Sequence, residues 1–188
     1  MPDSHENSID AAEFLAYAYS YEMVAKIILS DASLDLDTYS IEADDPWQQL
    51  IELKFHQYGL FSIFFLVRHY LELKLKGLIL SNGGKFLTIK THSLKVLIEN
   101  LGKLIGSDRI PPMVVEYIHS LDRFDATSEG LRYPYDNRGI KFNLGSPEDN
   151  ISNFNADRQN LINRVQERFE LISNHLTNLE HNLAEDNH

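Results

Sequence analysis

The segment from Trp47 to Leu80 limits the possible folds more than any other part of the chain. Its 34 residues contain no proline and many strong helix formers. Residues 60–67 are apolar on every side, which is typical of a helix surrounded by other helices. A straight helix of this length would measure about 51 Å, longer than a compact domain of this size. We therefore expect a bend or break near Gly59.

Apolar spacing predicts four further helices, at about residues 8–29, 92–105, 112–121 and 155–183. The first carries the repeat Ala11, Leu15, Ala18, Tyr21, Val24 and Ile28. The last carries a near-heptad stripe of Leu161, Val165, Ile172 and Leu179, with Ile162, Phe169, Leu176 and Leu183 beside it. Glycine (9) and proline (6) are too few for a many-turned all-β fold.

We therefore predict an all-α fold, an antiparallel bundle of about five helices forming a single domain over residues 1–188. One irregular loop or short hairpin is expected near residues 131–143, where two apolar runs flank turn residues. Residues 1–7 and 184–188 are expected to be frayed.

Charge and composition exclude several classes of function. The chain has 17 Lys and Arg against 28 Asp and Glu, a net charge of −11, which disfavours broad RNA binding. It has no cysteine, so disulfides, thiolate catalysis and cysteine zinc sites are excluded. We expect no metal, because an acidic run resembling a calcium loop has Leu36 where glycine is required. We also expect no cofactor, because no phosphate-cradling glycine-rich loop precedes a Lys-Ser or Lys-Thr pair. We expect no membrane association and a cytoplasmic location, since no leader or apolar span is visible.

A charged set follows the apolar run of the central helix. Arg68, Glu72 and Lys76 are spaced four apart, and His69 lies three residues before Glu72. This spacing places them on roughly one side of a helix, next to the core. Two interpretations remain open: an ion-paired helix face, or a ligand pocket lined by Arg68, His69 and Glu72.

Two shorter motifs are also candidate binding elements. In the irregular loop, Arg132 precedes Tyr133 and a proline, which holds a guanidinium on a stiff backbone beside an aromatic ring. It either anchors the loop onto the bundle or binds a phosphate or carboxylate. Before the third helix, Thr91 suits an N-cap and His92 would lie in the first turn. His92 is then either part of plain helix initiation or a neutral base.

Together these motifs resemble the HEPN superfamily, small α-bundles named for nucleotide binding in higher eukaryotes and prokaryotes. The likeness rests on the order of Arg68-His69-x-x-Glu72-x-x-x-Lys76, then Thr91-His92-x-Leu94, then Leu131-Arg132-Tyr133-Pro134, and covers residues 47–140. It implies a homodimeric bundle. It also implies a role in toxin–antitoxin, phage-defence or RNA-processing systems, with a protein partner such as an antitoxin or a nucleotidyltransferase.

Catalytic members of that superfamily carry Arg-x(4–6)-His on a late helix and act on an RNA phosphate across a dimer cleft. Arg168 and His175 match this spacing and lie one heptad apart, in register with the stripe that begins at Leu161. Two functions therefore remain open. The first is a non-catalytic HEPN-like binding or scaffold module, which the acidic balance favours. The alternative is a metal-independent endoribonuclease that uses Arg168 and His175.

Overall fold

The computed structural model describes residues 10–34, 46–124 and 151–186, with side chains described over 10–30, 63–122 and 163–186. These ranges contain five α-helices, two short 3-10 helices and no strand, which confirms the all-α bundle. The elements in chain order are α1 (Ala11–Leu34), α2 (Pro46–Ser81), η1 (Phe86–Ile89), α3 (Leu94–Ile105), η2 (Ser107–Arg109), α4 (Pro112–Phe124) and α5 (Ile151–Asp186). The hairpin expected near 131–143 lies outside the described residues.

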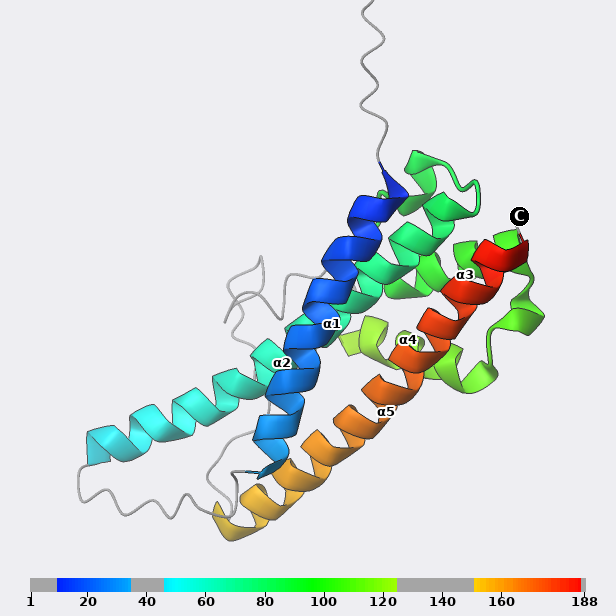
Figure 1. Cartoon of the computed structure of the whole chain (residues 1–188). Coiled ribbons are helices and arrows are strands. Elements are labelled where there is room, and N and C mark those ends of the chain that lie inside the picture. Colours follow the sequence, from blue (N-terminus) through cyan, green and yellow to red (C-terminus); the bar gives the residue numbers. More distant parts are fainter. Residues whose placement is uncertain (1–9, 35–45, 125–150, 187–188) are drawn as a thin grey trace, which may run out of the picture.

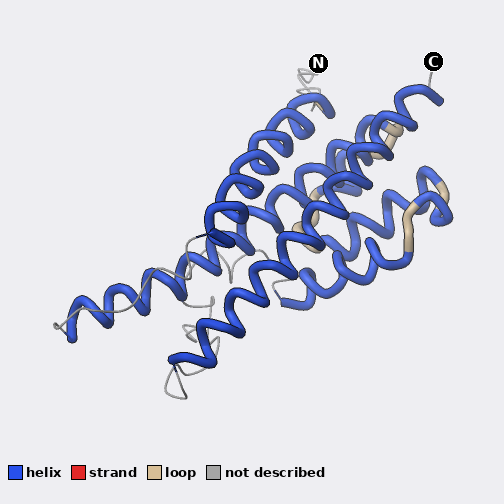
Figure 2. Tube along the Cα trace, turned by 60° about the horizontal axis from the view of Figure 1, so that its bottom comes forward, coloured by secondary structure: helices blue, strands red, loops and turns tan. Residues whose placement is uncertain are grey.

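The central helix α2 packs against α1, α3 and α5, and α1 also packs along α5. Figure 1 shows α1 running antiparallel to both α2 and α5. The N-terminal part of α2 extends beyond the bundle in both ribbon views (Figures 1 and 2). Among the described helices, none combines the length and the hydropathy that crossing a membrane requires.

Of the bend or break expected near Gly59, the break is wrong, because α2 continues through this residue as one helix of 36 residues. A glycine inside a helix costs only about 1 kcal/mol, which is too little to end a long run of helix formers. The length argument also fails, since the first part of α2 lies outside the bundle and need not fit within it.

The core lies where α2 meets the other helices. Its fully buried side chains on α2 include Val67, Tyr70, Leu71, Leu75 and Leu78. From α5 it takes Val165, Phe169, Ile172, Leu176, Leu179 and Leu183. Gly77 allows α1 to approach α2 closely, because a Cβ at this position would lie 2.7 Å from the Leu15 side chain. The near-heptad stripe predicted for the last helix is therefore the face that α5 buries.

The face buried by α1 matches the predicted stripe at Ala18 and is shifted by one residue from it in the second half of the helix. Ala18, Ala25 and Leu29 are buried, whereas Val24, part of the predicted stripe, is 45% exposed. The reason lies in composition: α1 is apolar on almost every side, so periodicity alone does not select the face that packs. A consequence is that apolar residues remain on its outer surface.

The third helix begins later than predicted, and Ser93 rather than Thr91 is its N-cap. The Ser93 side chain accepts a hydrogen bond from the backbone N–H of Val96. Asp122 of α4 adds a second cap, because its carboxylate accepts from the Leu94 N–H (2.6 Å) and from the Ser93 hydroxyl (3.0 Å). The helix ends at Gly106, whose φ of +96° is a conformation that favours glycine.

The final helix continues through Asp186, three residues into the stretch expected to be frayed. Leu183 is buried, and Asp186 accepts a hydrogen bond from Arg109 of η2 at 2.7 Å. These contacts hold the last turn against the rest of the bundle.

Candidate functional site

The charged set of α2 forms a closed network around the Glu72 carboxylate. Arg68 Nη1 donates to Glu72 Oε2 at 3.2 Å, and Lys76 Nζ donates to Oε1 at 2.8 Å. His92, twenty residues away in sequence, places its Nδ1 2.9 Å from Oε1. The His92 carbonyl accepts a further bond from Arg68 Nη2 at 2.6 Å. The segment before α3 is thereby tied to the middle of α2.

Burial separates the members of this network. The side chains of Arg68 and Glu72 are 1% and 4% exposed, whereas the His92 ring is 55% exposed. Burial alone would raise the pKa of Glu72. The hydrogen bond and charge of Lys76, together with His92, outweigh burial and hold the pKa of Glu72 below its ordinary value. Glu72 is therefore a buried carboxylate that stays ionised. The buried groups Arg68 and Glu72 find their hydrogen-bond partners within the network.

Among the predicted ligand-binding residues that the structure describes, His69 does not join Glu72. His69 faces α1, where its ring meets Tyr21 edge-on at 4.5 Å and stacks on Phe65 at 5.5 Å. His92 precedes α3 and is not in its first turn, since the helix begins at Leu94. Arg132 and Tyr133 lie outside the described residues. Of the six predicted ligand-binding residues, the structure thus brings together Arg68, Glu72 and His92.

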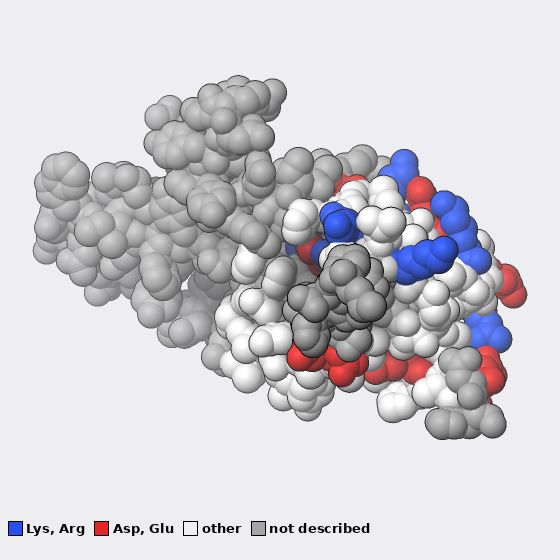
Figure 3. Space-filling view, turned by 90° about the horizontal axis from the view of Figure 1, so that it is seen from above, with Lys and Arg blue, Asp and Glu red and all other residues white. Residues whose placement is uncertain are grey.

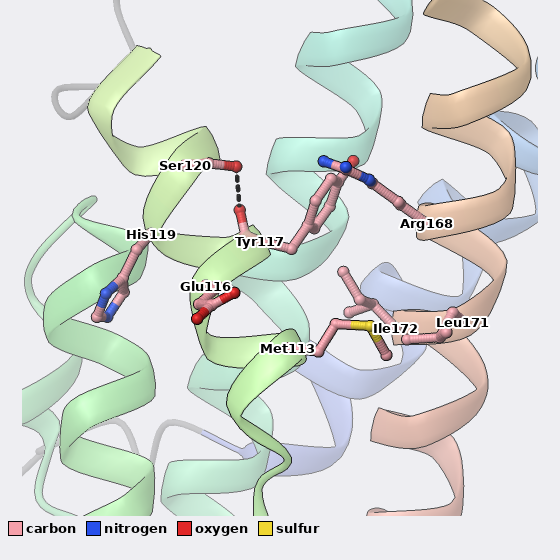
Figure 4. Close-up of a pocket in the computed structure, with 8 residues that line it drawn as sticks. All are labelled: Met113, Glu116, Tyr117, His119, Ser120, Arg168, Leu171 and Ile172. Carbon is pink, nitrogen blue, oxygen red and sulfur yellow. Dashed lines mark hydrogen bonds between the residues drawn. The ribbon is translucent and has the colours of Figure 1, made fainter.

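A second site lies between α4 and α5, whose backbones make few close contacts while α4 packs on α3. Side chains bridge the space and leave a cavity of about 510 Å³, lined by Met113, Glu116, Tyr117, His119, Ser120, Arg168, Leu171 and Ile172 (Figure 4). A smaller cavity of about 230 Å³ shares Tyr117, Ser120 and Arg168 and is also lined by Phe64, Leu121, Arg164 and Val165. We call the two together the α4–α5 groove.

The polar centre of the groove is formed by Tyr117 and Arg168. The exposed Arg168 guanidinium lies 5.8 Å from the centre of the Tyr117 ring, and the two side chains point toward each other (Figure 4). Burial raises the pKa of Tyr117 to about 12, although the Arg168 charge opposes the rise. The Tyr117 hydroxyl is therefore protonated at neutral pH. It is buried, with no hydrogen-bond partner among the described residues.

The remaining residues of the larger cavity add apolar side chains and one carboxylate to the groove. Met113, Leu171 and Ile172 supply the apolar side, and Glu116 lies on the rim contributed by α4 (Figure 4). The Ser120 hydroxyl donates to the Tyr117 carbonyl at 2.8 Å, which leaves its oxygen able to accept. A buried hydroxyl donor beside a guanidinium matches a ligand oxygen that carries negative charge.

His175 does not line the groove. It is half-buried, and burial lowers its pKa below 6.5 although the backbone of Arg109 acts in the opposite direction. Arg168 and His175 also do not occupy the centre of the buried stripe, contrary to the sequence interpretation. The buried residues Phe169 and Leu176 lie at that centre, and Arg168 and His175 lie one residue before each of them at its edge. Seven residues are nearly two helical turns, so spacing placed the pair correctly relative to each other but not relative to the core.

Sequence reasoning missed two buried carboxylates. Asp122 of α4 caps α3, and local sequence patterns do not predict this contact because 28 residues separate Asp122 from Leu94. Glu22 of α1 accepts from Lys26 at 2.7 Å and from Ser173 of α5 at 2.6 Å. Burial opposes ionisation of Glu22, but these bonds hold its pKa below the ordinary value. The spacing of Glu22 and Lys26, four apart on an otherwise uncharged stretch, was the available signal for this pair.

The surface charge is uneven despite the net acidity. Viewed from above, Lys and Arg gather over one part of this end of the molecule, while Asp and Glu follow another edge (Figure 3). Exposed Lys85, Lys90, Lys95 and Lys103 all belong to the segment between the end of α2 and the end of α3. None of these lysines lines the α4–α5 groove, so the positive charge of the groove comes from α5.

Comparison of the chain with protein-family models, with curated proteins and with solved structures gives no match.

Proposed function

We propose that the chain is a non-catalytic HEPN-like binding module that holds a ligand with an anionic oxygen and an apolar body in the α4–α5 groove. The observation that carries this proposal is the exposed Arg168 beside the buried Tyr117 hydroxyl, which has no hydrogen-bond partner among the described residues, next to the apolar side chains of the groove. A buried donor left unmatched costs about 1–3 kcal/mol, and a bound oxygen would recover this energy.

The Arg68–Glu72 network supports placing the ligand in the groove and not beside α2. Arg68 is almost completely buried and donates to both Glu72 and the His92 carbonyl. These hydrogen bonds join α2 to the segment before α3, so they have a structural role. Arg168, by contrast, is exposed and borders a cavity large enough for a small organic molecule.

Titration of the chain with phenyl phosphate, benzoate and inorganic phosphate tests this proposal, with binding followed by calorimetry. Phenyl phosphate should bind most tightly, because it joins the anionic and apolar parts in one molecule. Arg168→Gln should weaken its binding about 10- to 150-fold, the equivalent of a charge-assisted hydrogen bond of roughly 1.5–3 kcal/mol. Tyr117→Phe should weaken it less, because a neutral donor is lost.

The matched control is Arg109→Gln, which removes another exposed arginine that does not line the groove. Equal affinities for the wild type and the Arg168→Gln variant would contradict the proposal. So would an equal loss in the Arg109→Gln variant, because binding would then follow overall charge and not the groove.

The second candidate is a metal-independent endoribonuclease that uses Arg168 and His175. It is favoured by one observation: the lowered pKa of His175 would keep its imidazole neutral near pH 7, the form a general base requires. Incubation with total RNA in EDTA separates the two functions. Cleavage that either Arg168→Ala or His175→Ala abolishes, in a folded protein, would establish the enzyme and overturn the non-catalytic module.

A further inference from the structure

The outer face of α1 carries an apolar stripe that no other described element covers. Tyr17 and Tyr19 are 64% and 63% exposed, and Met23, Val24 and Ile27 are 42%, 45% and 57% exposed. Monomeric proteins rarely leave so many large apolar side chains together on one helix face. Between Phe14 and Ser30 the only charged residues are Glu22 and Lys26, which pair with each other.

The middle of this stripe has the spacing of a helix-pairing face. Ala16, Ser20, Met23 and Ile27 follow one another at intervals of four, three and four residues, and all are exposed. This is the spacing by which one helix packs along another with interlocking side chains. The Ser20 hydroxyl already donates to the Ala16 carbonyl at 3.2 Å, so covering it would strand no donor.

We propose that this stripe is the interface with a second copy of the chain, with the two α1 helices antiparallel about a two-fold axis. Size is distributed along the stripe in a way that suits this arrangement. Along the middle line of the stripe, the N-terminal half has the small residues Ala16 and Ser20 and the C-terminal half has the large residues Met23 and Ile27, while Tyr17 and Tyr19 flank this line on either side. A two-fold axis between Ser20 and Met23 places Ala16 opposite the partner's Ile27 and Ser20 opposite the partner's Met23. Small residues then meet large ones on both sides, whereas a parallel pair would place like against like.

The available area is sufficient for such an interface. A tyrosine offers roughly 150–250 Å² to a contact. With Met23, Val24 and Ile27, the stripe therefore presents on the order of 500 Å² per copy, or about 1,000 Å² in a pair, the size at which specific interfaces begin. Each copy carries a net charge of −11, so long-range repulsion opposes the pair while the neutral stripe does not. Salt should therefore tighten the dimer.

Light scattering after gel filtration tests the interface. The wild type should be a dimer whose dissociation constant falls as salt rises from about 50 to 500 mM. Ile27→Glu should give a monomer with an unchanged helical circular dichroism spectrum. Leu87→Glu is the matched control, because Leu87 is 76% exposed on η1, outside the stripe, and this variant should stay dimeric. A monomeric wild type, or a dimer that Ile27→Glu leaves intact, overturns the proposal.

Cross-linking tests the antiparallel register without depending on a destabilising charge. The chain has no cysteine, so Ala16→Cys and Ile27→Cys each introduce a single thiol. In the proposed pair, two copies of either variant hold their thiols about 16 Å apart, since eleven residues separate positions 16 and 27. This exceeds the reach of a disulfide. Neither variant alone should cross-link on oxidation, and an equal mixture should. Cross-linking of Ala16→Cys with itself, or no cross-link in the mixture, refutes the antiparallel pair.

Discussion

Replacing Glu72 with leucine should destabilise the protein by about 3–5 kcal/mol, the usual cost of breaking a buried charge pair from one side. Three donors converge on this carboxylate: Arg68 Nη1 at 3.2 Å, Lys76 Nζ at 2.8 Å and His92 Nδ1 at 2.9 Å. The Arg68 and Lys76 side chains are only 1% and 11% exposed, so water cannot replace the lost partner. The variant leaves two nearly buried cations beside an apolar side chain.

Urea unfolding followed by circular dichroism at 222 nm measures the effect as a change in the free energy of unfolding. The matched control is Asp186→Leu, which removes the carboxylate from the Arg109–Asp186 pair. That pair is 43% and 56% exposed, so its loss should cost under about 1 kcal/mol. The double variant Arg68→Met, Glu72→Leu should recover part of the lost stability, because it removes one stranded cation.

Two results would refute the reasoning. A cost for Glu72→Leu that equals the cost for Asp186→Leu would mean that water reaches the network and screens it. Additive costs in the double variant would mean that Arg68 and Glu72 do not depend on each other.

Two further predictions concern other carboxylates and pH. The pKa values of Glu72 and Glu22 lie below 4.5 in the folded protein, so their contribution to stability is complete above pH 4.5 and is lost as pH falls through the folded values. Stability curves of the wild type and Glu72→Leu should therefore run parallel above pH 5 and converge at lower pH; parallel curves down to pH 3 would contradict this. Asp122→Ala should cost about 2 kcal/mol, because it removes both the acceptor for the buried Leu94 N–H and that for the Ser93 hydroxyl. Urea unfolding checks this prediction against Glu99→Ala, an exposed acid on α3 whose loss should cost almost nothing, and equal costs would exclude the capping role.

The sequence alone was sufficient to predict the fold class and the approximate helix positions. Helical periodicity is a local property, because residues three and four apart share a face whatever the rest of the chain does. For the same reason the spacing of Arg68, Glu72 and Lys76 indicated their mutual contacts before the structure placed them in the core. Spacing alone could not decide between an ion-paired helix face and a ligand pocket, because it carries no information on whether other elements cover that face.

The tertiary structure decided which segments meet. His92 reaches Glu72 and Asp122 caps α3 across twenty or more residues, and no local pattern encodes such distances. Packing of α1 on α2, where Gly77 meets Leu15, buried Ala25 in place of the predicted Val24 on a helix that is apolar nearly all round.

The candidate site was also predicted in part by the sequence and decided in part by the tertiary structure. An Arg-x6-His spacing placed Arg168 and His175 on one side of a helix, because two helical turns are nearly seven residues. The separation between α4 and α5 then opened a groove beside Arg168 and left His175 out of its lining. A groove is the space that helices leave between them, so its position depends on how their axes are arranged, and the periodicity within each helix does not contain that information.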